Sequence, residues 1–81
     1  MYRLKYDPAA EAVHNGLPDE ASRALTLALA AACDDPIEAT QPYGLVDDGV
    51  IRKILTRDVL AILLIGTGRK ELTVLQVEYL A

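Results

Sequence analysis

The most constraining feature of this sequence is the uninterrupted apolar segment 59–65, in which all seven side chains are hydrophobic. The segment is too short to cross a bilayer, which needs roughly 20 such residues, and its pattern is typical of a central strand covered along most of its length. Apolar stretches 50–55 and 72–80 flank it across the short segments 56–58 and 66–70. Connections this short predict a three-stranded antiparallel meander.

The last of these stretches alternates less regularly than the others. Strict alternation places Leu72 and Val74 on one face together with Gln76 and Glu78. We therefore expect the end of this strand to approach solvent.

The N-terminal part begins with a strand and a short helix. Residues 2–6 alternate in character, which predicts a strand that ends at Asp7. The Asp7 carboxylate can accept hydrogen bonds from the first helical turn, where Pro8 is also well tolerated. We expect this helix to run to about Asn15, with Gly16 closing it.

A longer helix follows, with its start at Pro18 and its end at Pro36, which cannot continue the hydrogen-bond ladder. Its apolar side chains recur at spacings of three and four, which is the pattern of one buried stripe: Ala21, Ala24, Leu25, Ala28, Leu29 and Ala32. Residues 37–49 read as a long surface loop. The predicted architecture is a single α+β domain spanning residues 1–81, with an N-terminal strand, two helices and then the meander, packed as two layers with the helices on one face.

Composition narrows the function classes. Residues 1–48 carry three basic and nine acidic side chains, whereas residues 49–81 carry five basic and three acidic ones. The first part is therefore negatively charged and the second positively charged, and the net charge of the chain is −4. A domain that binds nucleic acid through a broad electrostatic footprint is normally basic, so any RNA contact is expected to be local. One cysteine, Cys33, and one histidine, His14, predict no disulfide, no metal site and no cofactor. Because no signal pattern precedes the first strand, we expect a soluble, cytoplasmic protein that does not contact membranes.

Several short motifs carry a family resemblance. They are Tyr-x-Leu-x-Tyr-Asp-Pro-Ala-Ala at residues 2–10, Leu-Pro at 17–18, Asp-Asp-Pro at 34–36 and Gly-Val-Ile-Arg-Lys-Ile at 49–54. Together they cover nearly the whole chain, which resembles the RelE/ParE superfamily of type II toxin–antitoxin toxins. The resemblance implies a RelE-like fold and a cognate antitoxin as partner.

The same resemblance implies two different activities on one fold. RelE-like members cut messenger RNA in the ribosome as metal-independent endoribonucleases, and ParE-like members inhibit DNA gyrase. RelE-like nucleases place basic residues on the strand after the loop, where this sequence has Arg52 and Lys53. They also place an arginine early in the next strand, where this sequence has Val59 and Leu60 after Arg57.

Metal-free RNA cleavage needs cations for the developing phosphorane charge, together with a base and an acid. The candidate catalytic residues are Arg52, Lys53 and Arg57, and the candidate RNA-binding residues are Arg69, Lys70 and Tyr43. Near the end of the sequence the candidate is Tyr79.

Each candidate also has a purely structural interpretation. Arg57, Arg69 and Lys70 lie in predicted turns, where charged side chains are usually solvated. Only one of Arg52 and Lys53 can point to a given face of a strand. His14 suits a helix C-terminus, and Tyr43 suits a loop anchor.

The sequence therefore leaves three hypotheses about function. They are a ribosome-dependent endoribonuclease, a ParE-like binder of a protein target, and a non-toxic relative that binds only an antitoxin or itself as a homodimer. An apolar helix stripe and an exposed strand edge suit a partner segment in any of the three.

Overall fold

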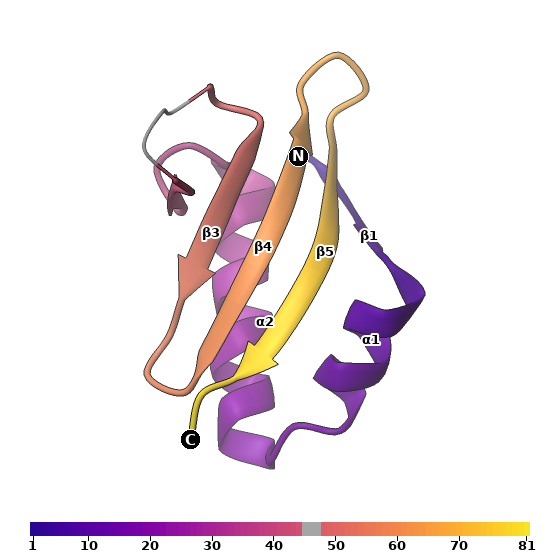
Figure 1. The fold of residues 1–81 in the computed structure, drawn as a ribbon. Coiled ribbons are helices and arrows are strands. Elements are labelled where there is room, and N and C mark those ends of the chain that lie inside the picture. The colour runs from indigo at the N-terminus through magenta and orange to yellow at the C-terminus, as the bar shows by residue number, and fades with distance from the viewer. Residues whose placement is uncertain (45–47) are drawn as a thin grey trace.

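Five strands form one sheet, and two helices pack toward the same face of it in the computed structural model (Figure 1). The structure describes residues 1–44 and 48–81. In chain order the elements are β1 (Arg3–Tyr6), α1 (Pro8–Asn15), α2 (Asp19–Asp34), β2 (Gln41–Pro42), β3 (Ile51–Leu55), β4 (Val59–Gly66) and β5 (Glu71–Tyr79). Within the described residues, neither helix is long and apolar enough to span a membrane.

The predicted meander is confirmed, but it is only part of the sheet. β3, β4 and β5 are antiparallel neighbours, and the full strand order is β1-β5-β4-β3-β2. β1 pairs in parallel with β5, with Leu4 opposite Leu72. The first strand is therefore a member of the sheet, and the two helices connect it to β2 at the opposite edge.

The segment predicted to be a long surface loop, residues 37–49, contains a strand. β2 pairs in antiparallel fashion with β3, placing Gln41 opposite Lys53 and Pro42 opposite Arg52. Proline lacks a backbone donor, so β2 is suited to the edge position that it occupies. Residues 45–47 of the predicted loop lie outside the described residues.

The helix starts follow the residues that mark them in the sequence. The Asp7 carboxylate accepts a hydrogen bond from the Ala9 amide at 3.0 Å, and Pro8 occupies the first turn of α1. The Gly16 amide closes this helix on the carbonyls of Ala12 and Val13. The predicted boundaries of both helices are right to within about two residues.

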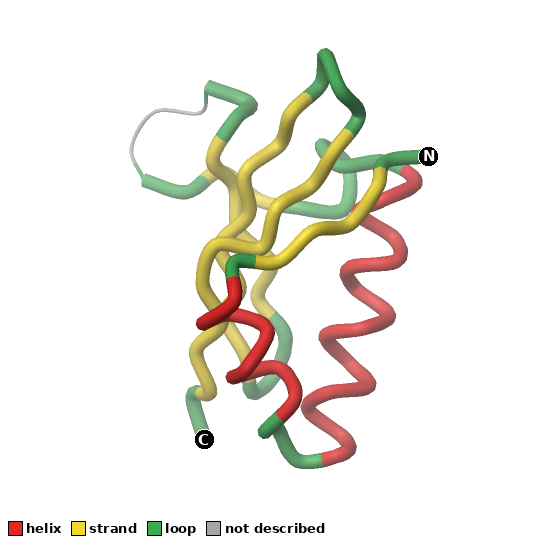
Figure 2. The backbone as a smooth tube through the Cα atoms, turned by 90° about the vertical axis from the view of Figure 1, so that its right-hand side faces the viewer, coloured by secondary structure: helices red, strands yellow, loops and turns green. Residues whose placement is uncertain are grey.

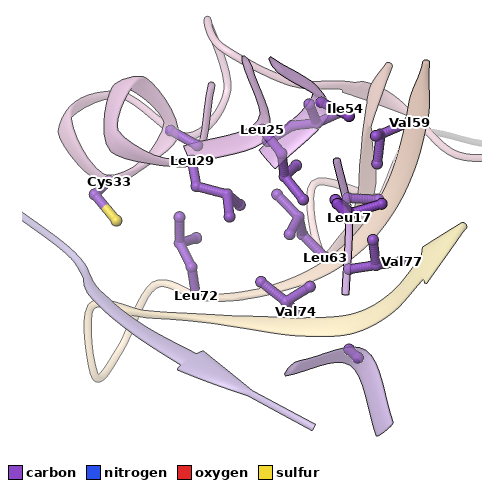
Figure 3. Packing of buried hydrophobic residues seen from close by; sticks show 14 of the residues in the cluster. Leu17, Leu25, Leu29, Cys33, Ile54, Val59, Leu63, Leu72, Val74 and Val77 are labelled. Atoms are coloured by element: carbon purple, nitrogen blue, oxygen red, sulfur yellow. The ribbon is translucent and has the colours of Figure 1, made fainter. Parts of the chain in front are cut away.

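The core lies between α2 and the sheet (Figure 3). Leu25 and Leu29 of α2 are fully buried against Leu63 of β4 and Leu72 and Val74 of β5. β4 contributes every second residue to this core, namely Val59, Ala61, Leu63 and Ile65. The apolar segment that dominates the sequence is thus the central strand of the molecule.

The expectation of strict alternation along β5 is wrong. Leu63 pairs with Val74, but Ile62 pairs with Gln76, so Leu75 is an extra residue in β5. This β-bulge reverses the faces beyond it. Val77 joins the core at 5% exposure, and Gln76 is exposed on the other face.

Replacing the buried Leu25 by alanine should strongly destabilise the protein, because the surrounding core can only partly fill the cavity. We expect the free energy of unfolding to fall by about 2–5 kcal/mol in urea denaturation. Leu27 is the matched control, since it lies on the same helix but is 66% exposed. A loss of similar size in Leu27→Ala would contradict this assignment of the helix faces.

Candidate functional site

The sheet has one face that neither helix covers. Alternation along β3 and β4 places Arg52, Ile54 and the core residues of β4 toward the helices, and sends the intervening side chains to the opposite side. We call this second surface the open face, and on these two strands it consists of Ile51, Lys53, Leu55, Leu60, Ile62 and Leu64. These strands therefore present a largely aliphatic surface with one positive charge.

The open face is well packed at its centre. Ile62 is only 7% exposed although no described helix lies over it, because Lys53 and Gln76 flank it on the neighbouring strands. Toward one end Leu55 is 53% exposed. Lys53 is half-buried, so its aliphatic stem covers apolar surface while its ammonium group can reach solvent.

Arg52 points to the other face and is 4% exposed. Its Nε donates to the Thr40 hydroxyl at 2.7 Å, and its Nη2 donates to the backbone carbonyls of Thr40 at 2.9 Å and Ile37 at 3.3 Å. The Thr40 hydroxyl in turn donates to the Pro36 carbonyl. This geometry favours a structural role for Arg52, which fastens the segment before β2 to β3.

The remaining candidate cations do not converge. Arg57 lies in the turn before β4, while Arg69 and Lys70 lie in the turn after it. β4 has eight residues, so a rise of about 3.3 Å per residue separates the two turns by roughly 25 Å. One phosphate group cannot contact both turns.

Two tyrosines also fall at different ends of the sheet. Tyr43 follows β2 and is 49% exposed, toward the end that carries Arg69 and Lys70. Tyr79 pairs with Val59 at the opposite end and is 43% exposed. The proposed RNA contacts therefore divide between the two ends of the sheet.

A shallow hollow of about 330 Å³ adjoins Arg57. Its lining combines both charge signs with aliphatic surface and comprises Glu20, Arg23, Ala24, Leu27, Arg57 and Asp58. Two carboxylates beside two guanidinium groups leave little net charge to attract an anion. This hollow is thus a poor phosphate site.

A charge cluster that the sequence did not indicate lies at the β1 edge of the sheet. Arg3 Nη2 donates to Glu71 Oε2 at 2.9 Å, and Lys5 Nζ lies 3.5 Å from the same oxygen. Partial desolvation raises the pKa of the Glu71 carboxyl, but the charges of Lys5 and Arg3 outweigh it and hold that pKa below its usual value. The parallel pairing of β1 with β5 brings these three residues together.

His14 links three elements of the fold. Its Nδ1 lies 2.9 Å from the Tyr6 hydroxyl of β1, and its Nε2 lies 3.2 Å from the Thr26 hydroxyl of α2. The Thr26 hydroxyl already donates to the Ser22 carbonyl, so it can only accept from Nε2. Neutral His14 then carries its proton on Nε2 and accepts from Tyr6 at Nδ1, which is a structural arrangement.

Cys33 is buried, and burial, followed by the neighbouring Asp34 carboxylate, raises the pKa of its thiol. A raised thiol pKa lowers the reactive thiolate fraction. Among residues 1–44 and 48–81, no three histidine, cysteine, aspartate or glutamate side chains are grouped so that they could hold a metal ion.

The chain matches no model of a protein family, and no characterised protein matches it by sequence. Solved structures do match. The E. coli RelE toxin within the intact RelBE toxin–antitoxin complex superimposes with a TM-score of 0.81 at 22% identity, over 98% of this chain and 96% of that one. Isolated E. coli RelE gives 0.83 at 21% identity, over 100% and 86%.

A third match is the RelBE2 toxin–antitoxin complex of Mycobacterium tuberculosis, with a TM-score of 0.79 at 15% identity over 96% of both chains. At such low sequence identity, these superpositions establish a shared fold. The RelE-like fold expected from the sequence motifs is therefore confirmed.

The role assigned to Arg52 predicts a loss of stability on substitution. Arg52→Met keeps most of the apolar stem but leaves the Thr40 and Ile37 carbonyls without this donor, so we expect the free energy of unfolding to fall by about 1–3 kcal/mol. Lys53→Met on the half-exposed opposite face should change it by no more than about 0.5 kcal/mol. Urea denaturation of both variants tests the assignment, and equal effects would contradict it.

The environment of the Tyr6 hydroxyl predicts that the stability of the fold depends on pH in the alkaline range. Burial, reinforced by the Glu11 carboxylate, raises the pKa of the Tyr6 hydroxyl above its ordinary value of about 10. The folded chain therefore holds this proton more tightly than the unfolded chain. The associated stability is complete below about pH 10 and is lost as pH rises through the folded pKa.

Tyr6→Phe should remove this part of the loss of stability at alkaline pH. It should also lower the free energy of unfolding by about 1 kcal/mol at neutral pH, because the hydrogen bond to His14 is lost. Urea denaturation between about pH 7 and 11 measures both effects. The exposed Tyr43→Phe serves as the control for loss of a phenol. If the free energy of unfolding of Tyr6→Phe fell with rising pH as steeply as that of the unmodified protein, the raised pKa of Tyr6 would be refuted.

Proposed function

We propose that this protein is the toxin of a type II toxin–antitoxin pair and that it is bound in the cytoplasm by a cognate antitoxin. The observation that carries the proposal is the superposition of nearly the whole chain on RelE toxins, two of which come from complexes with their antitoxins. The match extends over almost the full length of those toxin chains. It therefore includes the sheet and both helices, which are the elements that a partner would contact.

The surface of the protein is consistent with such a partner. The open face exposes large aliphatic side chains, including Leu55, and Leu27 on α2 is 66% exposed. Exposed apolar patches on a small domain commonly mark protein–protein interfaces. An antitoxin segment that covers such a patch would bury it from water.

Ribosome-dependent cleavage of messenger RNA is the finer proposal, and the position of Lys53 favours it. Lys53 is the one cation among the six side chains that β3 and β4 place on the open face. Arg57, Arg69, Lys70 and Tyr43 remain candidate RNA contacts at the two ends of the sheet. Arg52 is proposed to support Lys53 from within the fold, because it fastens the segment that leads into β2, and Gln41 of β2 pairs with Lys53.

Growth after induced expression of the chain alone in a bacterial host tests the proposal. Messenger RNA 5′ ends and the DNA-damage response are measured in the same cultures. We expect growth arrest with new, codon-phased 5′ ends. Arrest with DNA damage and no new ends would replace messenger cleavage by a gyrase-like protein target, and normal growth of cells containing folded protein would overturn the toxin proposal in favour of a non-toxic relative.

Lys53→Gln should lower cleavage by about a hundredfold, the usual scale for losing one group that stabilises transition-state charge. Arg23→Gln is the matched control, because it removes a positive charge that lies on α2. The abundance of new 5′ ends reports the result. If Lys53→Gln left the abundance of new 5′ ends unchanged, Lys53 would not be part of the catalytic site, but the proposal that the protein is a toxin would still hold.

A further inference from the structure

The side of α2 that faces away from the sheet carries a large apolar side chain in solvent. Figure 2 shows the sheet on one side of α2 and no other described element along its far side. Leu27 lies on this far side and is 66% exposed, although Leu25 and Leu29 of the same helix are buried in the core. The outer side of α2 therefore leaves apolar surface in water that a second molecule can bury.

The shallow hollow of about 330 Å³ lies beside this leucine. Its helical wall consists of four residues at the spacing i, i+3, i+4 and i+7, namely Glu20, Arg23, Ala24 and Leu27. Four residues of one helix form the hole that receives a single side chain of a neighbouring helix in knobs-into-holes packing. The turn before β4 supplies the second wall with Arg57 and Asp58. The hollow is thus shaped to receive one side chain of a packed helix.

The charges around the hollow are balanced in sign. Two carboxylates, Glu20 and Asp58, and two guanidinium groups, Arg23 and Arg57, line it. None of the four forms an ion pair or a side-chain hydrogen bond with another described residue. A strongly acidic or strongly basic partner would meet like charges here as well as opposite ones. A partner that carries the same mixture of signs can place each of its charges near an opposite one.

We infer that this surface is a two-fold interface between two copies of the chain, in which Leu27 of each copy inserts into the hollow of the other. When two α2 helices pack in antiparallel fashion in this way, Leu27 of one copy lies opposite Ala24 of the other. The two-fold axis makes both contacts identical, because the inserted side chain and the hollow belong to the same surface. The small Ala24 side chain lets the two helices approach closely.

Charge and size set the strength of this dimer. Each copy brings two positive and two negative side chains to the rim, so the paired rims carry no net charge. One helix face buries less than the roughly 800 Å² per partner of a standard interface. We therefore expect a weak dimer with a Kd on the order of 100 µM.

The dimer leaves both open faces uncovered. α2 packs on the core side of the sheet, so its outer side points away from Lys53 and the rest of the open face. A second copy on α2 and a different partner on the open face can therefore bind at the same time. The inference does not rest on the proposed function, and either can fail while the other holds.

Sedimentation velocity of the purified full chain between about 1 µM and 1 mM tests the inference. We expect a shift from monomer to dimer across this range. Leu27→Glu should weaken association at least about tenfold, because it places a carboxylate in each hollow. Glutamate is a good helix former and this position is exposed, so the variant should fold like the unmodified chain, which circular dichroism checks.

Leu55→Glu is the matched control, since Leu55 is 53% exposed but lies on the open face. This variant should dimerise like the unmodified chain. A chain that stays monomeric at about 1 mM would overturn the inference. So would a dimer that survives Leu27→Glu, or one that is lost in Leu55→Glu instead.

A charge exchange between two variants tests the two-fold arrangement. Glu20→Arg gives each hollow three cations, and Arg57→Glu gives each hollow three carboxylates. Each variant alone should dimerise about three- to tenfold more weakly than the unmodified chain. An equal mixture of the two should regain association in sedimentation at about 0.15 M salt, where long-range repulsion between acidic chains is screened. A mixture that associates no better than the separate variants would refute this interface.

Discussion

The packing of α2 across the central strand is the constraint on which the rest of the structure depends. Leu25 and Leu29 must be buried, and β4 offers Val59, Ala61 and Leu63 in alternate positions that suit them. Once this contact forms, the short turns on either side of β4 place β3 and β5 as its neighbours. The open face is left uncovered because two short helices can cover only one side of the sheet.

Much of this arrangement is encoded locally and was predictable. Helix starts, helix ends and strand boundaries follow from proline, aspartate and the apolar period, all of which act within a few residues. The meander was predictable because its connections are short. The parallel pairing of β1 with β5 was not, since nothing near residues 3–6 encodes which distant strand they join.

Two other features depended on long-range geometry. The bulge at Leu75 follows from fitting β5 against β4, and alternation alone put Val77 on the wrong face. Arg52 was a candidate catalytic cation because it lies on the strand where RelE-like nucleases place basic residues. Its burial depends on acceptors at Ile37 and Thr40, which the chain brings to β3 from more than ten positions away. The candidate site was accordingly less predictable than the fold.

The pairing of β1 with β5 also has a consequence for synthesis. Arg3 and its partner Glu71 are 68 positions apart, so β1 leaves the ribosome long before β5 does. Contacts of such long sequence separation form late and slow folding. During translation, the first strand and both helices are synthesised before the strands that bury their apolar side chains. In this interval chaperones or a partner protein can bind the nascent chain. The finished sheet can appear only after β5 has emerged, which delays any activity that requires the intact sheet.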